Sequence, residues 1–375
     1  MIARRAVDAI VGEELVPHLR VARCVRRRNP SNQCRACLLA CPHQALWFDA
    51  RGGWRLHAAA CDGCGACASA CPSQALDAPG IDLAVLRRAW RAGEEMRLGC
   101  RHGDGGQMLR LPCLAGLHPE LLATFLLRHP TTPVTFDVSH CGACARGSLR
   151  GVIEAQVRQA VAYARLLGVT PDVRFSAEDQ VPTPARPISR RDLFQLARER
   201  TTALVASSLA GGPDGDGSVA LPHRERLLRA ARERADLSDA PPCELPVAGA
   251  FFVDWQVGDA CDGCSQAGGP RCERACPNGA WRLGSSAGET VLSHDAARCS
   301  GCGACALACP QEALEPRSAP VTADAGRAAK RAFAVARCRV CRRRVSHGGD
   351  GLCPNCRKRQ GVAASLPPRA RVTST

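Results

Sequence analysis

Apolar residues between positions 96 and 175 follow two different spacings. Short apolar runs predict four strands: Met96–Leu98, Leu109–Leu111, Val134–Val138 and Val173–Phe175. Two longer stretches place their apolar residues three and four positions apart, which predicts helices over 120–128 and 149–167. Strands that alternate with helices predict a small α/β domain over residues 91–176.

A hairpin is predicted on either side of this domain. In the first hairpin, Leu46–Phe48 turns at Gly52 and Gly53 into Trp54–Leu56. In the second, Trp281–Leu283 turns through a glycine- and serine-rich segment into Val291 and Leu292. Each hairpin lies within a cysteine-rich segment, so the two segments are predicted to be similar modules on either side of the α/β domain.

Helical patterns also occur between the α/β domain and the second hairpin. Residues 190–209 and 223–234 have helical character, and a glycine-rich stretch separates them. We therefore interpret residues 177–245 as a helical linker.

The longest apolar runs are far shorter than the ~20 residues of a membrane-spanning helix, so no membrane span is predicted. Residues 1–20 interleave charged and apolar side chains, unlike the uninterrupted apolar core of a secretory signal. We expect a cytoplasmic protein. In that reducing compartment, 25 cysteines at close spacings indicate metal binding rather than disulfides.

The cysteines fall into six sets of four, and Cys243 remains as a bystander thiol. The sequence CDGCGACASACPSQAL, from Cys61, is duplicated as CSGCGACALACPQEAL, from Cys299. The spacing C-x2-C-x2-C-x3-C-P places three thiolates on one loop around a [4Fe-4S] cube, and its fourth cysteine faces a second cube. A looser set of four cysteines precedes each copy.

On these motifs the chain resembles the bacterial two-cluster ferredoxins twice, in modules assigned to residues 1–90 and 246–320. The crossed ligation of that family implies four [4Fe-4S] clusters. Their ligands would be Cys24, Cys34, Cys37 and Cys71; Cys61, Cys64, Cys67 and Cys41; Cys261, Cys264, Cys272 and Cys309; and Cys299, Cys302, Cys305 and Cys276. The inserts VRRRNPSNQ and SQAGGPR are longer than the corresponding spacers of the family.

A fifth set comprises Cys100, Cys113, Cys141 and Cys144. These residues follow predicted strands, and open α/β sheets place ligand sites beyond the carboxyl ends of their strands. We expect a fifth iron–sulfur cluster here, with zinc or unligated thiols as alternatives. The stretches RLPCLAGLHPELLATFL and VTFDVSHCGACARG also resemble the small iron–sulfur subunit of methyl-viologen-reducing hydrogenase. His102 and His140 adjoin these cysteines, and packing or surface roles are favoured for both.

The sixth set has the C-x2-C-x11-C-x2-C spacing of a zinc ribbon: Cys338, Cys341, Cys353 and Cys356. Zinc would fold a segment too short for its own core, so residues 321–375 are assigned to a zinc ribbon and basic tail. A single iron of the rubredoxin kind is the alternative. Arginines around the ribbon, such as Arg339 and Arg342, would also suit a nucleic-acid-binding surface.

The predicted fold class is α+β and multi-domain, with two ferredoxin-like modules flanking a small α/β domain and a C-terminal zinc ribbon. No set of residues with the arrangement of a catalytic site can be identified from the sequence. We therefore expect a non-catalytic electron-transfer protein, polyferredoxin-like, that serves a larger cytoplasmic oxidoreductase such as a hydrogenase, formate dehydrogenase or heterodisulfide-reductase-type complex. An assembly factor for a redox enzyme and a nucleic-acid-binding regulator are the alternatives.

The formal charge of +15 counts every thiol as neutral. A [4Fe-4S] core or a zinc ion with four thiolates carries a net charge of −2. Five clusters and one zinc would therefore lower the charge to roughly +3. The predicted basicity is local and is concentrated around the ribbon.

Overall fold

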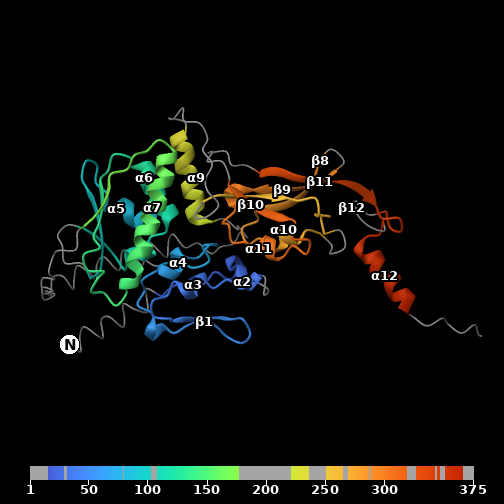
Figure 1. Ribbon diagram of the computed structural model, residues 1–375, viewed down its shortest axis with the longest axis horizontal. Helices are drawn as coiled ribbons and strands as arrows, with labels where there is room; N and C mark the ends of the chain where they lie inside the picture. Colours follow the sequence, from blue (N-terminus) through green and yellow to red (C-terminus); the bar gives the residue numbers. More distant parts are fainter. Residues whose placement is uncertain are drawn as a thin grey trace, which may run out of the picture.

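The computed structural model describes residues 16–28, 32–78, 80–102, 108–176, 221–235, 251–264, 269–286, 289–318, 327–342, 344–346 and 351–365. The helix predicted over 190–209 and the thiol of Cys243 lie outside these residues. Figure 1 shows the first cysteine-rich module in blue next to the green central domain, with the second module in orange and the C-terminal segment in red. No helix in the described ranges is long and apolar enough to cross a membrane.

The central domain contains a four-stranded parallel sheet in the order β4-β3-β5-β6. Its strands are β3 (Met96–Cys100), β4 (Leu109–Leu111), β5 (Val134–Phe136) and β6 (Val173–Phe175). All four predicted strands are therefore present. Side chains alternate across the sheet, so Met96 and Leu98 are buried while Arg97 between them is exposed.

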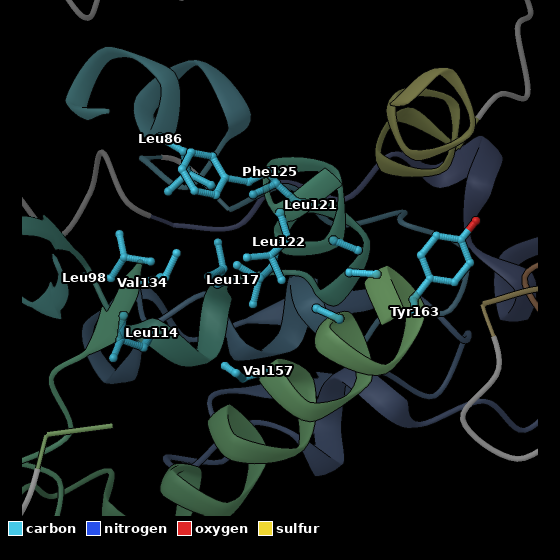
Figure 2. Close-up of a cluster of buried hydrophobic side chains, with 14 of the residues drawn as sticks. Leu86, Leu98, Leu114, Leu117, Leu121, Leu122, Phe125, Val134, Val157 and Tyr163 are labelled. Carbon is cyan, nitrogen blue, oxygen red and sulfur yellow. The ribbon is translucent and has the colours of Figure 1, made fainter. Parts of the chain in front are cut away.

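Four helices supply the rest of the central core: α5 (Leu83–Ala89), α6 (Pro119–Arg128), α7 (Arg150–Leu166) and α9 (Pro222–Ala235). Figure 2 shows Leu121, Leu122 and Phe125 of α6 between the sheet residues Leu98 and Val134 and the α7 residues Val157 and Tyr163. The short helices η3 (Leu114–Gly116) and η4 (Gly147–Leu149) follow β4 and β5. Helix α6 is buried on all sides because α5, α7 and α9 pack around it.

Helix α9 was expected in a linker, but it is part of the central core. It lies beside α6 in Figure 1, and its residues Leu227, Ala230 and Ala231 are buried in the central apolar cluster. Leu227 is completely buried. The helix therefore closes the central domain after a long connection.

The first module consists of short helices and one hairpin. Its elements are η1 (Val21–Arg23), α2 (Val25–Arg28), α3 (Ala36–Leu39), β1 (Leu46–Phe48), β2 (Trp54–Leu56), η2 (Ala58–Ala60) and α4 (Ala66–Ser69). The antiparallel pair β1–β2 confirms the predicted hairpin. A β-bridge between Leu19 and Leu76 joins the beginning and end of the module.

The second module has more extensive sheets. It contains β7 (Val253–Val257), α10 (Arg271–Ala275), β8 (Trp281–Ser286), β9 (Glu289–Asp295), η6 (Ala296–Arg298), α11 (Ala304–Leu307) and β10 (Leu314–Ser318). Strand β10 pairs with β7, and the antiparallel pair β8–β9 confirms the second predicted hairpin.

One sheet crosses the predicted boundary at residue 320. Strand β11 (Arg327–Arg337) pairs first with β9 and then with β12 (Arg344–Ser346), which gives the order β12-β11-β9-β8. Helix α12 (Pro354–Ser365) completes the C-terminal segment. The second module and this segment therefore belong to one continuous sheet.

Two histidines stack at the beginning of α6. The Nδ1 atom of His118 accepts a hydrogen bond from the Glu120 amide at 3.2 Å, and its ring lies 4.8 Å from the ring of His223. Burial, together with nearby Arg224, lowers the pKa of His118 to about 3. The folded domain therefore requires the neutral form of His118.

Acid should destabilise the central domain through His118. Its folded pKa lies below the unfolded value of ~6.5, so its contribution is complete above pH ~6.5 and is lost as the pH falls toward 3. The loss at pH 5 should be about 2 kcal/mol. His118→Asn keeps a capping acceptor that does not titrate. In urea denaturation, this variant should lose about 2 kcal/mol less than the unaltered protein between pH 7 and 5, and equal losses would contradict the assignment.

Candidate metal centres

Two cavities in the first module are each walled by four cysteines. Site 1 has an empty volume of about 350 Å³ and is lined by Cys24, Cys34, Cys37 and Cys71. Site 2 has an empty volume of about 330 Å³ and is lined by Cys41, Cys61, Cys64 and Cys67. The last cysteine of each motif thus lies with the first three of the other motif. The structure brings together the same two groups of four that the crossed pattern implied.

Helices α3 and α4 produce this crossing. Helix α3 contains Cys37 of site 1, and Cys41 of site 2 follows its end. Helix α4 contains Cys67 of site 2, and Cys71 of site 1 follows its end. The two cysteines are four residues apart, which is about one helical turn, so each helix and the residues that follow it supply one cysteine to each site. Gly65 begins α4 with a φ of 74°, a conformation that glycine adopts without strain.

The second module repeats the arrangement. Site 3 has an empty volume of about 300 Å³ and is lined by Cys261, Cys264, Cys272 and Cys309. Site 4 has an empty volume of about 270 Å³ and is lined by Cys276, Cys299, Cys302 and Cys305. Helices α10 and α11 again carry a cysteine of one site and are followed by a cysteine of the other.

A fifth cavity lies at the carboxyl edge of the central sheet. This central site has an empty volume of about 390 Å³, and four cysteines line it: Cys100, Cys113, Cys141 and Cys144. Cys100 ends β3, Cys113 follows β4, and the other two follow β5. His102, His140, Asp137 and Arg146 also line the cavity. The strand-end argument therefore located this group of cysteines.

Each ferredoxin-type site has a sulfur that accepts a backbone hydrogen bond. In every case the donor is the amide of the alanine four residues after the cysteine that precedes proline. The four N···Sγ pairs are Ala75–Cys71 at 3.2 Å, Ala45–Cys41 at 3.3 Å, Ala313–Cys309 at 3.4 Å and Ala280–Cys276 at 3.2 Å. Such bonds stabilise thiolate over thiol, which is the form that binds metal.

Three buried indole N–H groups also face these cavities. Within the described residues, the Nε1 atoms of Trp54, Trp255 and Trp281 have no oxygen or nitrogen acceptor. Trp54 lines site 1 and faces Cys37, whereas Trp255 and Trp281 line site 4 and face Cys299 and Cys305. A buried donor without a partner is costly, and a cluster sulfur would satisfy it. The sequence analysis placed Trp54 and Trp281 in predicted strands and predicted no element at Trp255.

Replacing Trp281 by phenylalanine should lower the reduction potential of site 4. A donor to sulfur stabilises the more negative reduced cluster, and a hydrogen bond of ~1 kcal/mol corresponds to about 40 mV for one electron. Trp90→Phe is the matched control, because that indole donates to Thr132 Oγ1 at 3.0 Å in the central domain. Potentiometric titration followed by EPR would measure the shift. An unchanged potential in Trp281→Phe would contradict this role.

Burial makes the free thiols poor acids. It raises the pKa of Cys37, Cys64 and Cys299 to about 12 and that of Cys141 to about 11. At neutral pH these groups would be protonated without a metal, so metal binding must release protons. The thiol sets therefore fit a strongly cationic core that converts them to thiolates.

The ribbon cysteines form a tighter group. The Sγ atoms of Cys338, Cys341, Cys353 and Cys356 all lie within 4.8 Å of one another. Backbone amides of Cys341 and Cys353 donate to Cys338 and lower the pKa of its thiol to about 6. Four sulfurs this close could bind zinc or a cluster, and zinc suits a closed tetrahedral set.

Closely paired cysteine sites with crossed membership are the arrangement expected of a dicluster ferredoxin. The family model described as 4Fe-4S dicluster domain matches residues 32–78, and a second model of the same description matches residues 260–314. The chain therefore contains two 4Fe-4S dicluster domains, as the sequence motifs predicted. No curated protein matches the chain. Both matches lie outside residues 91–176, so the resemblance of that part to a hydrogenase subunit stays a prediction.

Proposed function

We propose that this chain is an electron-transfer protein in which iron–sulfur clusters relay single electrons for a larger oxidoreductase. Five cavities, each walled by four cysteines, carry the proposal. Sites 1 to 4 would each hold a [4Fe-4S] cluster, the central site a fifth iron–sulfur cluster, and the ribbon a zinc ion. Hydrogenase, formate dehydrogenase and heterodisulfide-reductase-type complexes are the candidate partners.

The surroundings of the sulfurs support this function. Backbone and indole donors around the cavities are suited to hold the added negative charge of a reduced cluster. The protein itself contributes ligands, hydrogen bonds and burial, and each cluster supplies the capacity to accept and donate one electron. We propose that the chain is divided as the sequence suggested, into two ferredoxin-like modules, a central domain and a ribbon. Helix α9 is then part of the central domain and not of a linker.

Iron and acid-labile sulfide analysis of anaerobically purified protein tests the function. Four or five cubes should give roughly 16 to 20 iron atoms per chain, with EPR signals of reduced clusters after dithionite treatment. Fewer than about eight iron atoms per chain would contradict the proposal.

The ribbon surface supports a second candidate function, nucleic-acid binding. Arg339, Arg342, Lys358 and Arg359 are exposed there. Neutralised phosphates release counterions, so such binding should weaken steeply with salt. A gel-shift assay at low and at physiological salt would decide, and no shift at low salt would eliminate this function.

A further inference from the structure

We propose that the five cysteine sites form one unbranched relay in the order site 3, site 4, site 1, site 2 and central site. This inference rests on the proposed function and specifies the order in which electrons would pass between the sites. The cysteines of each site would hold a cluster that accepts and donates one electron, so each step would oxidise one cluster by one electron and reduce its neighbour by one. The two ends, site 3 and the central site, would exchange electrons with one-electron carriers outside the chain.

The steps inside the modules follow from the short helices. Within four residues, Cys37 of site 1 is followed by Cys41 of site 2, and Cys67 of site 2 is followed by Cys71 of site 1. Cys272 of site 3 and Cys276 of site 4 are related in the same way, and the Cys276 amide donates to the Cys272 carbonyl at 3.1 Å. Sites 1 and 2 are therefore direct neighbours, as are sites 3 and 4.

The step from site 2 to the central site depends on backbone contact. Gly65 follows Cys64 of site 2, and Gly116 lies three residues after Cys113 of the central site. A Cβ atom on Gly116 would lie 2.8 Å from the Cys64 carbonyl oxygen and 3.2 Å from the Gly65 Cα. The ligand loops of the two sites therefore touch, and only glycine permits this approach.

Polar contacts hold the same junction together. Asp62, which lines site 2, forms an ion pair with Arg146, which lines the central site. Arg101 Nη2 donates to the Asp62 carbonyl at 2.8 Å, and Ser69 Oγ donates to the Ala115 carbonyl at 2.6 Å. The residues of site 2 are thus bonded to Arg146 of the central site and to the segments that directly follow Cys100 and Cys113.

The step between the modules joins site 1 to site 4. Gln74, three residues after Cys71, donates to Glu120 at 2.9 Å. Arg224 pairs with the same Glu120 at 2.7 Å and donates to the carbonyl of Cys299 at 2.8 Å. This buried chain connects the ligand segment of site 1 with a ligand of site 4.

A second contact supports this junction. Arg28 Nη2, from the helix that follows Cys24, donates to the carbonyl of Arg274 at 3.4 Å, two residues before Cys276. The first module therefore has site 4 on one side and the central site on the other.

Removing either end of the relay tests the order. Cys141→Ala and Cys261→Ala should abolish the central site and site 3, and neither residue lies in a helix that serves two sites. In fully reduced full-length protein, magnetic coupling between cluster spins should broaden the EPR signals of neighbours. Cys141→Ala should reduce the broadening of site 2, which would keep only its coupling to site 1, and Cys261→Ala should reduce that of site 4, which would also keep only its coupling to site 1.

Gly116→Ala should weaken the coupling between site 2 and the central site without removing a ligand, because its Cβ would collide with backbone. Gly151→Ala is the matched control, since its Cβ would meet no atom within 4 Å. If Cys141→Ala changes the signals of site 3 or site 4, or leaves site 2 unchanged, the order is wrong although the clusters are present. Protein with fewer than about eight iron atoms would instead contradict the proposed function, and the relay with it.

Discussion

Replacing Arg224 by methionine should increase the opening of the α6–α9 contact by about two to four orders of magnitude. Arg224 is 3% exposed, and its guanidinium pairs with Glu120 and donates to the carbonyls of Cys299, Ala297 and Phe251. The guanidinium also lies 4.4 Å from the centre of the Phe252 ring. Its removal leaves a buried carboxylate and several carbonyls without a donor, at a cost of about 3–5 kcal/mol.

Hydrogen exchange along α6 and α9 would measure this opening in the native protein. Arg226→Met is the matched control, because Arg226 is exposed on the same helix and should change stability by less than about 0.5 kcal/mol. The double variant Arg224→Met with Glu120→Gln should recover part of the loss, since it removes the unpaired charge. Equal exchange in Arg224→Met and Arg226→Met would contradict a stabilising role for the buried pair.

Replacing Cys353 by alanine should abolish the folded ribbon. Cys353 is buried, its amide donates to Cys338 Sγ at 3.2 Å, and its own sulfur belongs to the four-sulfur group. Metal binding to such sites contributes about 10–16 kcal/mol to folding, so three cysteines should be insufficient. Limited proteolysis should then cleave the segment around residues 338–365 rapidly.

The rest of the chain supplies the control for this prediction. Strand β11 has its own partners in β9, so the second module should retain its iron and resist proteolysis in Cys353→Ala. Lys358→Ala is a matched substitution, because Lys358 is exposed on α12 and contributes no sulfur. Metal analysis should show loss of one zinc per chain in the cysteine variant alone. A protease-resistant ribbon in Cys353→Ala would show that metal does not hold this segment together.

Local rules account for what the sequence predicted well. The cysteine motifs resemble those of the two-cluster ferredoxins, and the crossed ligation of that family implied the groups of cysteines that line sites 1 to 4. Cys100 and Cys113 lie far from Cys141 in sequence, but parallel strands bring their carboxyl ends to one edge. The hairpins at Trp54 and Trp281 were predicted because alternation and turn residues specify them within a few positions.

Long-range contacts account for what the sequence did not predict. Glu120 and Arg224 have the chemistry of surface residues, and each is buried only because the other lies opposite it, 104 positions away. Helix α9 lies between the two cysteine-rich modules in the sequence, and the sequence analysis assigned it to a helical linker instead of a core. The pairing of β11 with β9 likewise joins two strands that are separated by residues 296–326, and no local pattern specifies it.

Strand β11 has a mechanical consequence for any partner of the ribbon. Its first residues are hydrogen-bonded to β9, Lys330 pairs with Asp254 of β7 at 2.5 Å, and Phe333 packs against Gly263 in the loop of site 3. The same strand then continues to the ribbon cysteines. A partner bound by the ribbon would therefore be held on a short, stiff tether beside site 3. The sheet that connects the ribbon to site 3, and not free diffusion, would therefore set the effective concentration of the partner at a cluster in site 3.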